Sequence, residues 1–185
     1  MSTEEPSIQS SVTTCHCVVV MGVSGSGKSV VGYSLSTLLR CKFIDGDDLH
    51  PRANILKMAS GQPLNDDDRL PWLIRLNDVA FSLSHKNERG VLVCSALKRR
   101  YRDILRKDNP GIMFIYLKGS FEVILERLQA RSGHFMPSSL LTSQFQALEE
   151  PSESEEPDVL HVNIDTGSVE EVSKLCYQML YQRNF

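Results

Sequence analysis

The sequence lacks the features that mark secreted, membrane-spanning and nucleic-acid-binding proteins. Its apolar runs are shorter than the roughly 18 consecutive residues that a membrane helix needs. Residues 1–14 are polar and include Glu4 and Glu5, where a secretory signal would be basic. The net charge of -3 and the pI near 6.0 provide no general basic surface for a phosphate backbone. We therefore expect a cytoplasmic protein with no nucleic-acid or membrane partner.

The five cysteines are odd in number, which argues against a disulfide framework. Most of them lie within apolar segments, so we expect reduced thiols in or near the core. The run Cys15-His16-Cys17 contains zinc-ligand types, but structural zinc usually takes four ligands from spaced pairs. The sequence has no second cluster of that kind. We therefore do not expect a zinc site.

The 185 residues suit one α/β domain. We predict a flexible tail at residues 1–14 and a single domain at 15–185. Short apolar runs predict strands, and apolar stripes with a period near 3.6 predict helices between them. The strands are expected at residues 17–21, 43–44, 91–94, 112–117 and 159–164. This alternation predicts a three-layer αβα fold with a five-stranded parallel sheet.

Two helix starts follow from local chemistry. Pro71 precedes an apolar stripe, and proline suits the first helical turn, so we expect a helix to begin there. Ser168 and Glu171 have the spacing of a capping box before the last helix.

Three polar stretches fall outside this rhythm. Residues 46–69 and 132–137 are candidates for a substrate-binding region and a lid. Residues 149–158 are acidic and flanked by proline, which is typical of a solvated connection.

The strongest motif is a phosphate loop between the first strand and the first helix. It fits the pattern G-x-x-x-x-G-K-S, and its members are Gly22, Val23, Ser24, Gly25, Ser26, Gly27, Lys28 and Ser29. The glycines allow several backbone N–H groups to surround one anion at the positive end of a helix. Lys28 would neutralise the β and γ phosphates of ATP, and Ser29 would offer a hydroxyl to Mg²⁺.

Other residues distinguish phosphoryl transfer from a switch function. The guanine-reading motif N-K-x-D is absent, and the third strand ends at Cys94-Ser95, without the aspartate of an ordinary Walker B strand. Asp45 and Asp47 follow the second strand instead, where ligands of parallel sheets bind. One carboxylate could hold Mg²⁺, for which we choose Asp45, while Asp47 accepts a substrate hydroxyl proton. The alternative is that this acidic run only forms a turn and caps a helix.

Beyond the phosphate loop, motifs spread over residues 18–151 resemble the gluconokinase family. They are the segments Asp45-Gly46-Asp47-Asp48-Leu49-His50-Pro51, Pro63-Leu64-Asn65-Asp66-Asp67-Asp68-Arg69, Pro71-Trp72-Leu73, Cys94-Ser95-Ala96-Leu97-Lys98, Tyr101-Arg102-Asp103, Gly133-His134-Phe135-Met136-Pro137 and Gln144-Phe145. The resemblance implies a nucleoside-monophosphate-kinase-like P-loop fold, with a substrate region at 46–69 and a small lid at 132–141. It also implies transfer of the ATP γ-phosphoryl group to the 6-hydroxyl of D-gluconate, and a homodimer.

The resemblance further implies roles for individual residues. Gluconate is a polyol with one carboxylate, so its site should offer cations and hydrogen-bonding groups. The residues expected to bind it, besides Asp47, are His50, Arg52, Asn65, Arg69, Lys98 and Arg102. Arg102 is the choice for the carboxylate, and Lys98 could instead cover the transferred phosphoryl group. Arg127 is expected at adenine, Arg131 at the phosphates, and His134 on a lid that excludes water.

Two other interpretations remain. The acceptor could be a different small acid, such as shikimate or another aldonate, because stereochemistry depends on contacts that spacing does not reveal. A nucleoside monophosphate is disfavoured because the acids of residues 46–69 would repel a second phosphate. The protein could also be a non-catalytic ATP-binding regulator, which would leave Asp45 and Asp47 without a purpose.

Overall fold

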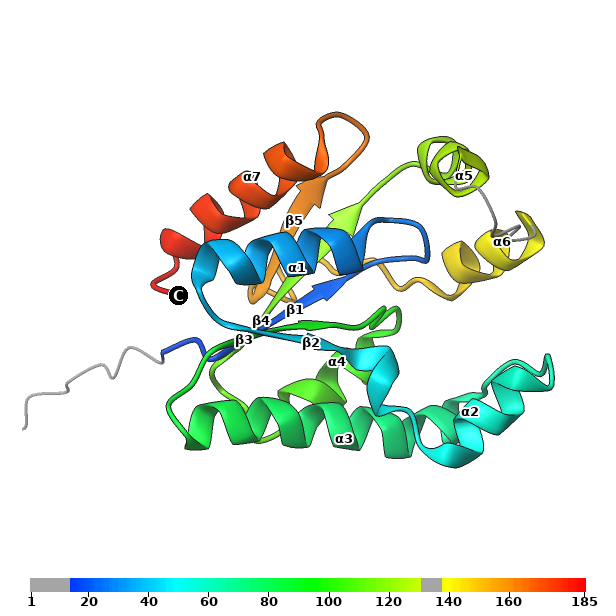
Figure 1. Cartoon of the computed structure of the whole chain (residues 1–185), viewed down its shortest axis with the longest axis horizontal. Helices are drawn as coiled ribbons and strands as arrows, with labels where there is room; N and C mark the ends of the chain where they lie inside the picture. Colours follow the sequence, from blue (N-terminus) through cyan, green and yellow to red (C-terminus); the bar gives the residue numbers. More distant parts are fainter. Residues whose placement is uncertain (1–13, 131–137) are drawn as a thin grey trace, which may run out of the picture.

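The computed structural model describes residues 14–130 and 138–185 and shows a parallel sheet between two layers of helices (Figure 1). The five strands lie in the order β2-β3-β1-β4-β5, and all neighbouring strands run parallel. The strands are β1 Cys17–Met21, β2 Lys42–Asp45, β3 Gly90–Val93, β4 Ile112–Lys118 and β5 Val159–Asn163. The predicted three-layer αβα fold is confirmed.

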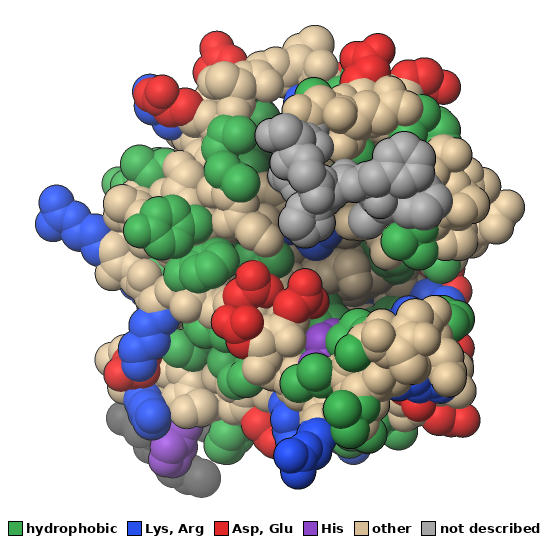
Figure 2. Space-filling view, turned by 45° about the vertical axis from the view of Figure 1, so that its right-hand side comes forward, with side chains coloured by type: hydrophobic (Ala, Val, Ile, Leu, Met, Phe, Trp, Pro, Cys, Tyr) green, Lys and Arg blue, Asp and Glu red, His purple; other side chains and the backbone are tan. Residues whose placement is uncertain are grey.

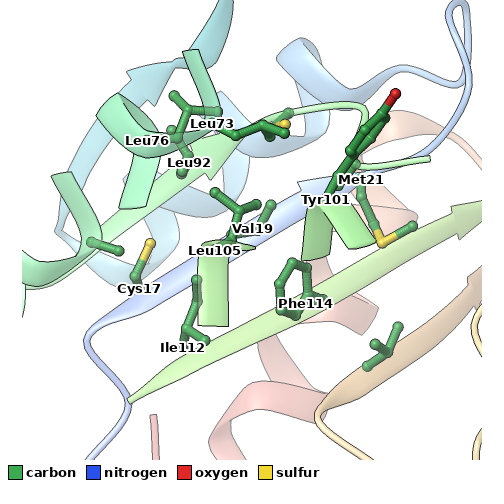
Figure 3. Close-up of a cluster of buried hydrophobic side chains, with 14 of the residues drawn as sticks. Cys17, Val19, Met21, Leu73, Leu76, Leu92, Tyr101, Leu105, Ile112 and Phe114 are labelled. Atoms are coloured by element: carbon green, nitrogen blue, oxygen red, sulfur yellow. The ribbon is translucent and has the colours of Figure 1, made fainter. Parts of the chain in front are cut away.

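The central strand β1 is buried along its whole length because it has a strand on each side and helices on both faces. Its alternate side chains enter different cores. Cys17, Val19 and Met21 pack into one core, which Figure 3 shows, while Val18 and Val20 pack into the other. The continuous apolar run in the sequence reflects this double burial.

Helices cover the two faces of the sheet (Figure 1). α1 (Lys28–Leu39) packs beside α7 (Val169–Tyr181) on one face. α3 (Asp66–His85) packs beside α4 (Arg99–Arg106) on the other. No helix in residues 14–130 and 138–185 is both long and apolar enough to cross a membrane.

Further helices lie beyond the carboxyl ends of the strands (Figure 1). They are the 3-10 helix η1 Gly46–Leu49, α2 Arg52–Ala59, α5 Phe121–Ala130 and α6 Ser138–Ala147. Leu128 of α5 and Leu141 of α6 share a third apolar cluster with Val23 of the phosphate loop. Because ligands of parallel α/β sheets bind at this edge, these helices border the expected site.

The two predicted helix starts have different outcomes. Ser168 and Glu171 form the predicted capping box of α7. The prediction that a helix begins at Pro71 is wrong, because α3 begins at Asp66 and its capping box joins Asn65 to Asp68. Strong capping chemistry upstream sets the start, and proline is accommodated inside the helix.

Two interpretations of polar stretches also change. Residues 46–69, predicted to lie outside the alternation of strands and helices, form η1, α2 and the start of α3. Residues 149–158 are not merely a solvated connection, because Glu156 is only 3% exposed and accepts hydrogen bonds from Arg102. The sequence shows the charge of this stretch but not its distant partner.

All five cysteines are unpaired. Burial raises the pKa of Cys15, Cys94 and Cys176 to about 12, so these thiols remain protonated near neutral pH. Within the described residues, no three His, Cys, Asp or Glu side chains gather in a way that could hold a metal ion. Cys15 instead donates from its thiol to the carbonyl of Cys17 at 3.6 Å.

Candidate active site

The phosphate loop joins β1 to α1 and depends on glycine at its turns. Gly25 and Gly27 have φ angles of 82° and 92°, which side chains of L-residues rarely adopt. Gly27 immediately precedes α1, and the Lys28 ammonium turns back to donate to the carbonyl of Val23 at 3.0 Å. The start of α1 directs backbone N–H groups and the positive end of the helix dipole toward the loop, which favours an anion.

The loop borders a cavity of about 390 Å³. Lys28 and Ser29 line it from α1, and Asp47 lines it from η1 after β2. The remaining lining residues are Ser24, Gly25, Gly27, Val30, Val93, Cys94, Ser95 and Gln144. Figure 2 looks toward this end of the molecule and shows acidic side chains gathered near the centre of the face. A cation, a hydroxyl and a carboxylate thus share one space, as phosphoryl transfer requires.

Asp45 and Asp47 have different surroundings. The Asp45 carboxylate accepts from the backbone N–H of Asp47 at 3.0 Å and so caps η1. Asp47 itself is exposed and faces the cavity. Gly46 between them is required by close approach, because a Cβ there would lie 2.3 Å from the carbonyl oxygen of Val93. One carboxylate oxygen of Asp45 is therefore used in the turn, whereas Asp47 lines the cavity.

His50 lies behind this turn and is buried. Its Nε2 is 4.0 Å from Oδ1 of Asp47, and its Nδ1 faces the side-chain amide nitrogen of Asn54 at 3.3 Å. That nitrogen also donates to the carbonyl of Asp68 at 2.9 Å, which identifies it as the donor to Nδ1. The proton of a neutral His50 then resides on Nε2, on the side of Asp47.

The other polar residues of the substrate region occupy different positions. Asn65 caps α3, with its side-chain oxygen accepting from the N–H of Asp68 at 2.8 Å. Arg69 donates to the carbonyl of Leu64 at 2.6 Å. Arg52 is exposed at the first position of α2. These three residues do not line the cavity beside the phosphate loop.

Lys98 precedes α4, and its ammonium binds both carboxylate oxygens of Asp66 at 3.1 Å. The hydroxyl of Tyr101 and the guanidinium of Arg100 contact the same carboxylate. The hydrogen bond from Tyr101, together with those from Lys98 and Arg100, lowers the pKa of Asp66 to about 2. Lys98 therefore follows Ser95, which lines the cavity, in the same loop, and its ammonium is paired with a carboxylate of the protein.

The expectation that Arg102 binds the carboxylate of gluconate needs correction. Its side chain is only 1% exposed, and its guanidinium forms a bidentate pair with Glu156, with both distances 2.7 Å. The remaining guanidinium donors reach backbone carbonyls. A planar guanidinium does bind a carboxylate here, but it is one from the protein's own chain.

Arg127 lines a second cavity of about 290 Å³, which shares Gly25 and Gly27 with the first. Its Nη2 donates to the carbonyl of Ile164 at 2.5 Å. The rest of the lining combines the phosphate loop and α1 with the turn before α7 and its start: Ser26, Val30, Val31, Gly167, Ser168, Val169 and Val172. A flat group attached to phosphates in the loop could therefore enter this space.

Ser95 and Gln144 are polar residues that line the first cavity and were not among the predicted site residues. Ser95 follows β3, and Gln144 of α6 accepts from the backbone N–H of Ser24 at 2.8 Å through its side-chain oxygen. Both residues belong to motifs that carry the family resemblance, and that membership was the sequence signal that could have pointed to the site. Arg131 and His134 lie outside the described residues.

The sheet order, the phosphate loop after the central strand and the acidic turn after β2 define a P-loop kinase with a nucleoside-monophosphate-kinase-like fold. Consistent with this class, the family model for shikimate kinase matches residues 24–173.

Closer relatives identify the family. The chain is 57% identical over 150 residues to the thermoresistant gluconokinase of Escherichia coli (strain K12), covering 81% of this chain and 85% of the relative. It is 54% identical over 160 residues to the thermosensitive gluconokinase of the same strain, covering 86% and 84%. The crystal structure of a gluconokinase from Sinorhizobium meliloti 1021 has 41% identity and a TM-score of 0.74, covering 94% of this chain and 99% of that one. The chain belongs to the gluconokinase family.

Proposed function

We propose that the protein transfers the γ-phosphoryl group of ATP to the 6-hydroxyl of D-gluconate, giving 6-phospho-D-gluconate. The observation that carries this proposal is the shared cavity of Lys28, Ser29 and Asp47, in a chain that is 57% identical to a gluconokinase. Lys28 supplies positive charge at the phosphates, and Asp47 accepts the proton of the attacking hydroxyl. Positioning and charge neutralisation are the main needs of this reaction.

The two cavities share lining residues of the phosphate loop, which supports the placement of ATP. The phosphates bind at the loop and the start of α1, and adenine enters the second cavity beside Arg127. A guanidinium can stack on a flat aromatic ring, which agrees with that role. Gln144 would bring α6 to the same loop through its bond to Ser24.

The oxygen donors near the loop suit Mg²⁺, which prefers phosphate, carboxylate and water oxygens. Ser29 offers a hydroxyl in the cavity. One carboxylate oxygen of Asp45 accepts the N–H of Asp47, and the second oxygen is the proposed ligand of the ion. We propose that Ser29 and Asp45 hold the ion. When bound, it neutralises charge on the phosphates.

The gluconate site is proposed on the side of η1, α2 and α3. His50, Arg52, Asn65, Arg69 and Lys98 come from this side or face it. Together they provide cations for the carboxylate and polar groups for the hydroxyls. Arg131, immediately before the lid at 132–141, is proposed to bind the phosphates, and His134 is proposed to act from the lid, which would exclude water from the transferred group.

A second candidate acceptor is shikimate, because the matching family model is that of shikimate kinase. A coupled ADP-release assay with Mg²⁺-ATP decides between the acceptors when D-gluconate, shikimate, other aldonates, glycerol, AMP and no acceptor are compared. We expect turnover that depends on gluconate and is lost in Lys28→Met. Release with shikimate alone would support the second candidate, and nucleotide binding without release would support a regulator.

The proposal includes a homodimer in the cytoplasm. The dimer rests on the family resemblance, and exposed apolar side chains on α2 and α3, such as Ile55, Leu70 and Ile74, offer a surface for it. The unpaired cysteines agree with a reducing compartment. Light scattering on the eluting protein measures the mass of the assembly, and a monomeric mass at micromolar concentration would refute the dimer.

A further inference from the structure

Arg102 is buried, and it connects three separate segments of the chain. Its Nε and Nη2 donate to the two carboxylate oxygens of Glu156 at 2.7 Å. Its Nη1 donates to the carbonyls of Ala96 and Leu97 at 3.0 and 3.2 Å. Its Nη2 also donates to the carbonyl of Glu149 at 3.0 Å. The full fork of the guanidinium is therefore used within the protein.

The first connected segment is the loop 94–98 between β3 and α4, which borders the phosphate site. Ser95 lines the cavity, and its carbonyl accepts from the N–H of Gly22 at 3.3 Å. The next residue, Ala96, has a φ of 44°, a conformation that alanine adopts only when its surroundings impose it. The bonds from Arg102 to this loop are part of those surroundings.

The second segment is the chain that leaves α6. Its backbone N–H at Glu149 donates to the carbonyl of Leu97 at 2.8 Å. The Glu149 carboxylate accepts from the N–H of Arg99 at 2.7 Å, at the start of α4. Five residues earlier, Gln144 binds the backbone of Ser24 in the phosphate loop. Loop 94–98 and α6 are thus joined to each other and to the phosphate loop.

We propose that Arg102 is a positioning residue for phosphoryl transfer. It fixes loop 94–98 against the chain leaving α6, so that Ser95, Lys98 and Gln144 keep their places around the phosphate loop. The inference rests on the proposed kinase function. It replaces the expected contact between Arg102 and gluconate with a contact that acts through the backbone.

A neighbouring arginine provides a matched control. Arg106 also binds Glu156, at 2.7 Å, and its other hydrogen bonds go to the carboxylates of Asp103 and Asp158. Although burial acts to raise it, the pKa of Glu156 is lowered to about 2 by the hydrogen bonds from Arg102 and Arg106. Both arginines therefore stabilise the same anion. Among the described residues, Arg102 donates hydrogen bonds to loop 94–98, whereas the hydrogen bonds of Arg106 go to carboxylates.

The variants Arg102→Lys and Arg106→Lys keep the charge and remove the planar fork. Small misplacements of reacting groups can lower rates by about 10²-fold, so we expect kcat of Arg102→Lys to fall by about tenfold or more. The KM values for gluconate and ATP should stay within about threefold, because no substrate contact is lost. Arg106→Lys should keep kcat within about twofold. A rise in the KM for gluconate with unchanged kcat in Arg102→Lys would overturn the inference in favour of direct binding.

Hydrogen exchange measured by mass spectrometry tests the same inference without an acceptor. At a temperature where both variants are folded, amides of residues 94–99 and 144–149 should exchange faster in Arg102→Lys than in Arg106→Lys. Equal exchange in the two variants would overturn the inference. If the wild-type enzyme did not phosphorylate gluconate, the proposed function would fail, and the exchange comparison would still decide what Arg102 holds.

A surface variant covers the case in which Arg102→Lys does not fold. Glu149 is exposed, so Glu149→Ala should fold, and it removes the acceptor of the Arg99 N–H without altering the buried pair. We expect kcat to fall by about threefold with both KM values preserved. An unchanged kcat in this variant would count against coupling between α6 and loop 94–98.

Discussion

The imidazole of His50 lies flat against the indole of Trp72, with ring centroids 4.2 Å apart and an angle of 15° between the planes. Trp72 also donates from its indole N–H to the carbonyl of Gly46 at 2.7 Å, so the stack joins α3 to η1. Burial lowers the pKa of His50; Asp47 acts in the opposite direction, and Arg69 adds to the lowering. The folded state therefore favours the neutral imidazole.

This stack predicts a loss of stability in mild acid. Below about pH 6.5, the unfolded chain takes up a proton at His50 more readily than the folded chain. The free energy of unfolding therefore decreases as the pH is lowered. His50→Phe keeps the stack but cannot be protonated, and it should flatten this part of the dependence. Urea unfolding at about pH 7.5 and about pH 5.5 measures the effect.

The control for this prediction is His85→Phe, because His85 lies at the exposed end of α3 and stacks on Phe81. It should retain the wild-type pH dependence. Equal flattening in both variants would show that His50 is not the source.

Asp47 and Asp48 are neighbours in η1, but only Asp47 lines the cavity. If Asp47 accepts the proton of the attacking hydroxyl, Asp47→Asn should lower kcat by about 10² to 10⁴-fold, the usual contribution of a general base. Asp48→Asn should keep kcat close to the wild-type value. Steady-state ADP release at saturating substrates measures both, and similar losses in the two variants would point to charge at the turn rather than to a base.

Asn65 was expected to contact gluconate, and in the structure it caps α3. Asn65→Ala should lower the free energy of unfolding by about 1 kcal/mol through loss of the cap. Asn65→Ser restores a capping side chain and should restore that stability. If Asn65 also binds gluconate, the KM for gluconate stays raised in the serine variant, whereas a capping role alone returns it to the wild-type value.

Ser168→Ala is the matched control for Asn65→Ala. Ser168 caps α7 with the same capping-box geometry, although it borders the second cavity rather than the first. It should cost about 1 kcal/mol as well, and it should leave the KM for gluconate unchanged. Urea unfolding and steady-state kinetics on the same preparations give both quantities.

The fold could be predicted from local sequence because each strand carries its own signal. The run Cys17–Met21 is apolar at every position, since β1 is buried on both faces. The start of α3 was missed because proline is a strong helix-start signal, and it hid the capping box of Asn65 and Asp68 upstream. When two helix-start signals lie close together, the residue pattern does not show which of them starts the helix.

The site divides in a similar way. The phosphate loop is contiguous, so residue spacing alone predicts Lys28 and Ser29 in one cavity. Arg102 meets Glu156 across 54 residues of sequence, and no local pattern reveals that pair. The chemistry of a guanidinium predicts a carboxylate partner, but only the fold decides whether that carboxylate belongs to a substrate or to the protein.

Arg127 gives a prediction for the nucleotide. It lines the second cavity, and removal of its side chain should weaken the site for adenine. In Arg127→Ala we expect the KM for ATP to rise by about tenfold, as expected for loss of a stacking contact worth about 1 to 2 kcal/mol. The KM for gluconate should change little in the same variant. A matching rise in both KM values would instead indicate that Arg127 supports the fold through its bond to Ile164.

Lys98 and Lys57 form a natural comparison at the start of α3. Lys98 binds Asp66 and Lys57 binds Asp68, and both lysine side chains are 29% exposed. Solvent screens both pairs, so Lys57→Met and Lys98→Met should have similar small effects on the free energy of unfolding. The two variants should differ in catalysis. If Lys98 leaves Asp66 to cover the transferred phosphoryl group, Lys98→Met lowers kcat by about 10²-fold, whereas Lys57→Met keeps it. Wild-type kcat in both variants would mean that Lys98 serves only its pair with Asp66, and the charge on the transferred group would have to be met by Lys28 and the lid.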